Sequence, residues 1–328
     1  MSAAENRRSS LSMLQGDLRL DMHYTFAETD TDAIRTIPIE SSESWTRPPM
    51  SFSSEYLAQL AAFADQSPLP RVRALHLPPI QPVHDHKGEF CAVELTDGSL
   101  GLSYVLLDDV LAQLHHGTGD FGLAGADALE VARHFVSGQG AERTIGFATA
   151  NALSRCLYDR AGFRPRDSID SIGQMNPQQG DSIGMIGLFR PLLGRVLESG
   201  ARLTVVELKA ALVGEHDGYR VTLDAEDLAA CNKVISTSTL LLNDTLDQML
   251  AHCRKARWFA MIGPSAGCLP DALFARGVTL LGGSWITERE GFISALTSGL
   301  SHSEFTSKYA LTSDGYPGWR ALIQRARN

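Results

Sequence analysis

Small and hydroxylated residues interrupt or follow three buried segments in the second half of the chain, each with the length and composition of a strand. These residues are Gly184, Gly187, Thr237, Ser238, Gly263 and Ser265. In an open parallel sheet, the carboxyl ends of the strands meet the amino ends of the following helices, so hydroxyls and free backbone N–H groups gather at one edge. We therefore expect a small-molecule site there, for a polar ligand that is anionic or bears a carboxylate.

Glu207 closes the next predicted strand and has the acid–base capacity that the neighbouring hydroxyls lack. Burial would have to raise its carboxyl pKa for it to act as a catalytic group near neutral pH. It also follows Gly184 and Gly187 by about 20 residues, as a ribose-binding acid does, although the full GxGxxG fingerprint is missing. A nucleotide- or S-adenosylmethionine-dependent enzyme is therefore an alternative function. The two glycines also have a purely structural explanation, namely a tight turn and close packing of the helix on the strand.

Four further polar residues are candidates for the same site. Asn243 and Thr245 continue a hydroxyl-rich segment, of which helix capping explains one residue and not the rest. Arg190 would bring positive charge to a predicted helix start. Asn151 belongs to a helix of small and apolar residues near the domain junction, and a buried amide needs hydrogen-bond partners. Asn151 therefore either reaches into an interdomain cleft or has a structural role.

His84 and His86 suggest a directly bound metal, because alternate positions of a strand share one face. Two histidines do not complete a site, and Glu89 or Cys91 would have to be added across the adjoining turn. Binding of a transition metal is therefore a second hypothesis, and the cofactor is otherwise unknown. The five cysteines form no CxxC pair, which disfavours both a disulfide framework and a cysteine zinc cluster.

The composition narrows the class of protein. A net charge of −9 over 328 residues disfavours a nucleic-acid partner, and no apolar run reaches the length of a membrane span. The N-terminus lacks the apolar segment of a secretory signal. These features are typical of a cytoplasmic protein with a small-molecule partner. They leave open whether it forms a homo-oligomer and whether it is an enzyme.

The elements that must position these residues fall into two groups. After a polar extension over 1–48, we expect a helix over 52–66, a β-meander over 80–86, 89–95 and 100–106, and helices over 108–116, 124–137 and 141–158. From 181 onward, apolar strands alternate with helices. The prediction is an α+β domain over 49–163, a linker over 164–180, and an α/β domain with a Rossmann-like, open, mostly parallel sheet and a C-terminal tail over 181–328.

Two sets of segments carry a family resemblance: 89–102 and 145–153 in the first half, and 184–192, 206–207, 239–245 and 263–265 in the second. Through them the chain resembles the bacterial and archaeal family labelled "putative heavy-metal chelation". The resemblance implies an enolase-N-terminal-like domain joined to a Rossmann-like domain. It also implies a ligand site between the two and a link to metal, metallophore or cobalamin metabolism. The family tends to carry glycine where this chain has Thr237, which adds bulk and a hydroxyl there.

The leading hypothesis makes one geometric demand. Asn151, Glu207, Asn243 and Ser265 come from distant parts of the chain, and they must meet where the two domains face each other. If they do, the protein binds or transforms a small polar metabolite in that place, one that is anionic or chelates a metal. If they lie on separate surfaces, the hypothesis fails.

Overall fold

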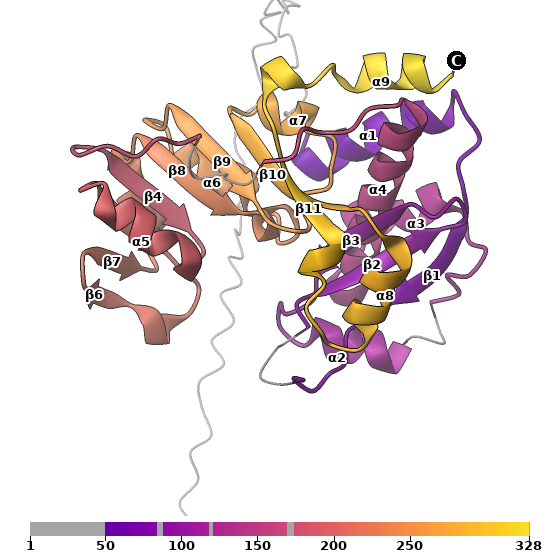
Figure 1. Cartoon of the computed structure of the whole chain (residues 1–328), viewed down its shortest axis with the longest axis horizontal. Coiled ribbons are helices and arrows are strands. Elements are labelled where there is room, and N and C mark those ends of the chain that lie inside the picture. Colours follow the sequence, from indigo (N-terminus) through magenta and orange to yellow (C-terminus); the bar gives the residue numbers. More distant parts are fainter. Residues whose placement is uncertain (1–49, 84–87, 118–120, 169–173, 328) are drawn as a thin grey trace, which may run out of the picture. The chain divides into compact units, whose positions relative to one another are not determined.

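The meander of the first half is a three-stranded antiparallel sheet in the computed structural model, which describes residues 50–83, 88–117, 121–168 and 174–327. Its strand order is β1-β2-β3, and helices precede and follow it (Figure 1). The elements are α1 (Phe52–Ala64), β1 (Val72–His76), β2 (Phe90–Leu95), β3 (Leu100–Tyr104), α2 (Val110–Gly117), α3 (Ala128–Ser137) and α4 (Gly140–Arg160). The α+β order expected from the sequence is confirmed.

The first strand of this sheet is not where the sequence predicts it. The expected range was 80–86, whereas β1 covers Val72–His76. Its alternation is hard to recognise because a bulge shifts the register between Val72 and Ala74, and the residue between them, Arg73, is exposed. Two prolines at 78 and 79 then prevent its extension, since proline cannot donate to a β-ladder.

Helix α4 is the central element of the first half. Residues 144–154 are all buried, so most of its length is enclosed on every side. Strand β3 packs directly on this helix. A Cβ atom on Gly101 would lie 2.1 Å from the carbonyl oxygen of Ala148 and from the amide nitrogen of Ala152. This close approach places Asn151 of α4 against the backbone of β3.

Within the described part of the chain, eight strands form the second sheet, in the order β11-β10-β9-β8-β4-β5-β7-β6. They are β4 (Ser182–Ile186), β5 (Arg202–Val206), β6 (Gly214–His216), β7 (Tyr219–Thr222), β8 (Lys233–Thr237), β9 (Trp258–Ile262), β10 (Leu280–Ile286) and β11 (Thr306–Leu311). Only the two edge strands, β6 and β11, pair antiparallel. The open, mostly parallel Rossmann-like sheet is therefore confirmed, while the β6–β7 hairpin and β11 are additions that the sequence did not indicate.

Helices cover both faces of the large sheet (Figure 1). The helices of this half of the chain are α5 (Arg190–Glu198), α6 (Leu246–His252), α7 (Asp271–Phe274), α8 (Arg289–Thr297) and α9 (Trp319–Ala326). Alternate residues of β4 enter different cores: Ile183 and Met185 pack with Val196 of α5, whereas Ile186 joins the main core that includes Leu153 of α4. Burial on both faces explains why the parallel strands are continuously apolar.

The C-terminal segment returns to the first sheet, where Phe292 of α8 packs with Ala92 and Leu102. The main core also contains residues of both sheets, and Pro49–Asn328 forms one compact unit. The domain boundaries near 163 and 180 stay predictions, and the extension over 1–48 lies outside the described residues. Among the described residues, no helix combines the length and apolar character that a membrane span requires.

The strand order of the large sheet reverses beside β4. The chain passes from β4 to β5 on one side and returns later to β8 on the other. The register aligns Ile186 with Val206 and with Ser236. Open α/β sheets bind ligands at such a reversal, outside the carboxyl ends of the strands. The residues that follow the three aligned positions are Gly187, Glu207 and Thr237.

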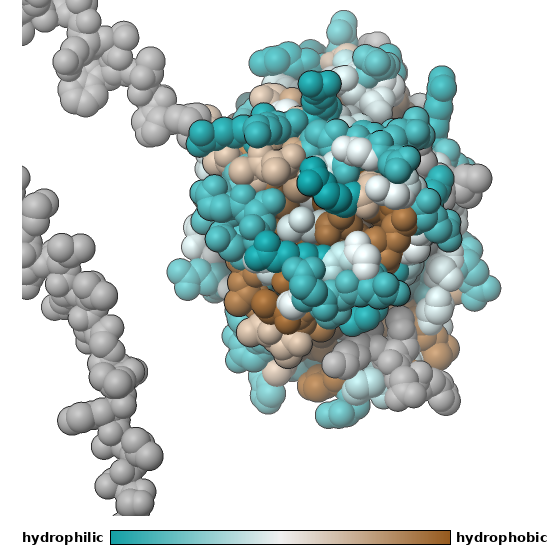
Figure 2. Space-filling view, turned by 90° about the vertical axis from the view of Figure 1, so that its left-hand side faces the viewer, coloured by the Kyte–Doolittle hydropathy of each residue, from teal (hydrophilic) through white to brown (hydrophobic). Residues whose placement is uncertain are grey.

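The end of the large sheet that carries α5, β6 and β7 presents a mostly hydrophilic surface with hydrophobic patches (Figure 2). Large apolar side chains exposed in this part of the chain are Leu208 (80%), Val213 (48%) and Leu223 (52%). Contiguous apolar surface often marks a protein–protein contact. The sequence leaves open whether the protein forms a homo-oligomer, and these three residues are where such a contact would be sought.

Candidate functional site

A row of polar residues crosses the carboxyl edge of the large sheet, beginning at Glu207. Its carboxylate accepts hydrogen bonds from the backbone N–H groups of Leu188, at 2.7 Å, and Leu208, at 3.0 Å. The side chain thereby ties the loop after β4 to the end of β5. In the described part of the chain, no Lys, Arg or His side chain forms an ion pair with it, so its charge is held by backbone dipoles alone.

The next members of the row are Gly187 and Thr237. Gly187 has φ +83°, a conformation that favours glycine, and a Cβ atom there would lie 3.2 Å from the methyl group of Thr237. The Thr237 hydroxyl accepts a hydrogen bond from the N–H of Thr239 at 3.3 Å. Gly184 is different: it lies inside β4, where a Cβ would meet Leu228 at 2.7 Å. It is therefore a packing glycine, not part of a phosphate-binding turn.

The row continues through Ser238 and Ser265. Their hydroxyl oxygens are 3.0 Å apart and share a hydrogen bond, and each residue is 2% exposed. Gly263 allows this contact, since its φ is +154° and a Cβ atom would lie 2.2 Å from the Ser238 hydroxyl oxygen. The two serines thus join the end of β8 to the loop that follows β9.

Asn151 ends the row, and both its amide nitrogen and its amide oxygen form hydrogen bonds within the protein. Its Nδ2 donates to the carbonyl oxygens of Leu102 and Ser265, both at 2.9 Å. Its Oδ1 accepts from the hydroxyl of Tyr56 at 3.2 Å. One buried amide therefore links α1, β3 and the β9–α7 loop, and a structural contribution of Asn151 follows directly from these contacts.

Buried tyrosines hold the same β9–α7 loop. The Tyr309 hydroxyl donates to the carbonyl oxygen of Ala266 at 2.7 Å, and the Tyr158 hydroxyl donates to that of Cys268 at 3.3 Å. Burial raises the pKa of both phenols, so both remain protonated donors. The carbonyl groups of the loop are therefore fixed by partners in the protein interior.

Three of the predicted residues lie apart from this row. Asn243 accepts hydrogen bonds from the N–H of Thr245, at 3.3 Å, and from its hydroxyl, at 2.7 Å, which makes a local turn before α6. Arg190 is exposed at the start of α5. In the described part of the chain, no hydrogen bond or ion pair connects any of the three to the residues from Glu207 to Asn151. Their roles as ligand-binding residues remain predictions.

Tyr104, the last residue of β3, is a further candidate for the site that the sequence did not single out. Burial raises the pKa of its phenol, and the nearby carboxylates of Glu89 and Glu207 raise it further. Its hydroxyl has no hydrogen-bond partner among the described residues. We call the region where β3 meets the carboxyl edge the β3 junction, with Tyr104 and Glu207 at one end and Leu102 and Asn151 at the other. In sequence, a tyrosine that ends an apolar strand indicates only a core residue.

The described residues offer a partial set of metal ligands. Among them, no three His, Cys, Asp or Glu side chains lie where they would hold one ion. The five cysteines are free and buried, and burial raises the pKa of Cys91 and Cys268 to about 12, which disfavours thiolate ligands. The phenol of Tyr104 and the nearby carboxylates of Glu89 and Glu207 are hard oxygen donors. His84 and His86 lie outside the described residues.

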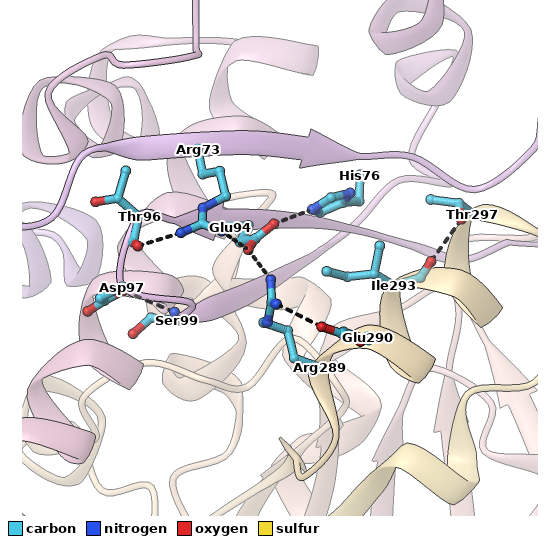
Figure 3. A network of polar contacts seen from close by, with 10 residues as sticks. All are labelled: Arg73, His76, Glu94, Thr96, Asp97, Ser99, Arg289, Glu290, Ile293 and Thr297. Carbon is cyan, nitrogen blue, oxygen red and sulfur yellow. Dashed lines mark hydrogen bonds and ion pairs between the residues drawn. The ribbon is translucent and has the colours of Figure 1, made fainter.

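A second polar cluster lies where α8 covers the first sheet (Figure 3). Glu94 of β2 is 3% exposed. Its Oε1 accepts from Arg289 of α8 at 2.6 Å and lies 3.6 Å from Arg73, while its Oε2 is 2.9 Å from Nε2 of His76. We call these four residues the Glu94 network. Arg73 is the extra residue of the β1 bulge, which re-aims its side chain toward the network.

Two family models match this chain, over residues 88–154 and 170–313, and both are described as "Putative heavy-metal chelation". The chain belongs to this family. The heavy-metal chelation models together cover well over half of the chain, one on each sheet. They make metal binding the activity to be tested, and they name no specific metal or substrate.

One sequence relative and two crystal structures resemble this chain. An uncharacterized protein of Methanocaldococcus jannaschii is 27% identical over 142 residues, which are 42% of this chain and 52% of that protein, so the match spans about half of the relative. Crystal structures of family members with unknown function are similar in fold. The one from Desulfitobacterium hafniense has a TM-score of 0.58 and 17% identity, with coverage of 80% of this chain and 98% of that one. The one from Pyrococcus horikoshii has a TM-score of 0.57 and 20% identity, with coverage of 80% and 99%.

Proposed function

We propose that this protein binds a transition metal as a chelate, a small anionic metabolite that already holds the ion, at the Tyr104 end of the β3 junction. One observation carries the proposal. Tyr104 ends β3 and Glu207 follows β5 beside the reversal of strand order, and the carboxylates of Glu89 and Glu207 lie near enough to raise the pKa of the Tyr104 phenol. Neither carboxylate has a cationic partner in the described part of the chain. A bound cation would supply the missing positive charge.

The small number of donors favours a chelate over a bare ion. Two carboxylates and one phenol do not form a complete coordination shell for a transition metal, and no third His, Cys, Asp or Glu joins them among the described residues. A chelating metabolite would bring the remaining ligands with it. Its own negative charge would suit the polar row and the positive end of α5, where Arg190 is exposed.

Glu207 is better suited to positioning the ligand than to proton transfer. Both of its oxygens already accept backbone N–H groups, at 2.7 and 3.0 Å, which fix the side chain in one orientation. Each oxygen keeps a lone pair that could approach a metal. A catalytic role for Glu207 therefore remains a sequence-based prediction, and binding does not depend on it.

Iron(III) citrate is a suitable probe, because a phenolate bonded to iron(III) gives a visible charge-transfer absorption. We expect the full-length protein to bind iron(III) citrate and to show this absorption. Tyr104→Phe should abolish the absorption and weaken binding about tenfold, the loss of one ligand contact of about 1.4 kcal/mol. Tyr219→Phe is the matched control, since Tyr219 is also partly buried but lies in β7. It should behave like the wild type.

Two outcomes would contradict the proposal. One is equal absorption and affinity in the wild type and in Tyr104→Phe. The other is binding of metal-free citrate as tightly as iron(III) citrate, which would make the site an anion site without a metal. Native mass spectrometry of protein purified without a histidine tag would complement the titration, because a co-purified metal chelate would appear as a defined mass increase.

A further inference from the structure

A small cavity of about 30 Å³ lies at the Asn151 end of the β3 junction. It is lined by residues of β3, α4, β10 and the β9–α7 loop, including Arg155, Gly267, Ser284 and Trp285. One water needs roughly 10–15 Å³ of such space, so the cavity holds about two waters. That is also the room that the two oxygens of a carboxylate require.

Arg155 is fixed in position beside this cavity. Its guanidinium carbon lies 3.8 Å from the centre of the Trp285 ring. Its Nε donates to Asp159 at 2.8 Å, and one terminal nitrogen donates to the carbonyl oxygen of Ile286 at 3.1 Å. The other terminal nitrogen has no acceptor among the described residues. A guanidinium held by stacking and two hydrogen bonds presents its remaining N–H groups without further loss of side-chain entropy.

Two more hydrogen-bond donors at the cavity are available to a ligand. The backbone N–H of Gly267 and the hydroxyl of Ser284 have no hydrogen-bond partner in the described part of the chain. The carbonyl groups on either side of Gly267 are already bonded, since Ala266 and Cys268 accept from buried tyrosines. The carbonyl groups that flank Gly267 are thus satisfied while its N–H donor is left over, which is the polarity of an anion site.

We propose that this cavity binds one carboxylate group of a small anionic ligand. The Arg155 guanidinium donates to one carboxylate oxygen, and Gly267 N–H and the Ser284 hydroxyl donate to the other. Asp159 already neutralises part of the Arg155 charge, with its exposed carboxylate on the Nε side. The site therefore suits a single carboxylate and not a multiply charged phosphate. This inference does not require a metal at the Tyr104 end.

Formate is the smallest probe of this chemistry. The amide resonance of Gly267 would be followed by NMR in the full-length protein while sodium formate replaces sodium chloride at constant ionic strength. We expect a saturable shift of that resonance. Formamide, which has the same shape without the charge, should produce none.

Gly267→Ala tests the cavity with little risk to the fold. The nearest atoms that an added Cβ would meet belong to the side chain of Asn151, at 3.4 Å or more, which is ordinary contact. The methyl group would occupy space that the carboxylate needs, so formate affinity should fall at least tenfold. In this variant the affinity would be read from the indole N–H resonance of Trp285, which also lines the cavity. Gly194→Ala is the control, because nothing lies within 4 Å of a Cβ there.

Arg155→Lys tests the guanidinium, and Arg143→Lys is its matched control. Arg143 also belongs to α4, donates to a carbonyl oxygen, pairs with a carboxylate and lies over an aromatic ring, but it does not line the cavity. We expect at least tenfold weaker formate binding in Arg155→Lys and unchanged binding in Arg143→Lys.

The result that overturns the inference is a wild-type response that is not saturable or is matched by formamide. Equal formate affinity in Gly267→Ala, Arg155→Lys and the wild type would overturn it as well. Failure of iron(III) citrate to bind at Tyr104 would leave the formate result intact, so the two proposals fail separately.

Discussion

The Glu94 network and the Glu207 end of the β3 junction both hold a carboxylate among donors, but in different ways. Glu94 is buried and receives two arginines and a histidine, which hold it between the first sheet and α8. Glu207 receives two backbone N–H groups and no side-chain cation in the described part of the chain. The charge of Glu94 is balanced by side chains inside the protein. The carboxylate of Glu207 is held in one orientation, but no side chain in the described part of the chain balances its charge.

This difference separates a structural polar cluster from a candidate binding site. A buried charge that is fully paired stabilises one arrangement of the chain and has nothing left to offer a ligand. A carboxylate held only by dipoles keeps its charge available to an incoming cation. The same distinction applies within the β3 junction, where the amide of Asn151 is fully bonded while Tyr104 and Arg155 keep donors or acceptors free.

The largest effect on stability is expected at Asn151. Asn151→Ala removes the donors of two buried carbonyl groups, those of Leu102 and Ser265. The free energy of unfolding should fall by about 3 kcal/mol, since each unsatisfied group costs about 1–3 kcal/mol. Asn243→Ala is the control and should cost about 1 kcal/mol or less, because its bonds are local and partly exposed. Urea denaturation measures both. Equal, small losses would show that the Asn151 amide is not a structural link.

A paired comparison of Glu94→Gln and Glu207→Gln tests the contrast directly. Glu94→Gln should cost about 2 kcal/mol of unfolding free energy, less than a fully buried ion pair because its arginines are 39–48% exposed and can rehydrate. Glu207→Gln should cost about 1 kcal/mol, one backbone hydrogen bond. The two variants should rank the other way in binding: the affinity for iron(III) citrate should fall about tenfold in Glu207→Gln and stay unchanged in Glu94→Gln. Loss of binding in Glu94→Gln, at unchanged stability, would place the ligand at α8 instead.

Much of the fold follows from local patterns in the sequence. The alternation of apolar strands with helices located β4, α5, β5, β8 and β9 to within a few residues. The irregular elements were missed for a physical reason: β1 has a bulge, and β6, β7 and β11 join the sheet only through pairing with distant strands. Edge and bulged strands owe their structure to their neighbours, which a local pattern cannot reveal.

The candidate site was harder to predict because hydrogen bonding decides which polar groups are free. The sequence placed Gly187, Glu207 and Thr237 at one edge through the ends of parallel strands, and the register brings them to that edge. It could not show that the side-chain oxygen of Asn243 is already hydrogen-bonded to Thr245. Nor could it show that Tyr104, from the other sheet, would lie near Glu207. Such contacts across the fold depend on tertiary packing.

The last prediction concerns the pH dependence of binding at Tyr104. Burial and the carboxylates of Glu89 and Glu207 raise the pKa of this phenol, so it carries its proton at neutral pH. A metal that bonds to the phenolate oxygen must displace that proton. Wild-type affinity for iron(III) citrate should therefore increase with pH, by about tenfold per unit for one released proton, as long as pH stays below the raised pKa. Tyr104→Phe should lack this slope when it is measured in the same buffers between pH ~7 and ~8.5. Comparing the two proteins removes the contribution of the probe's own titration, because that contribution is the same for both. Identical slopes would mean that no proton leaves Tyr104 and that the metal does not bond to its phenolate. The Glu207 end of the junction would then differ from the Glu94 network only in its unbalanced charge.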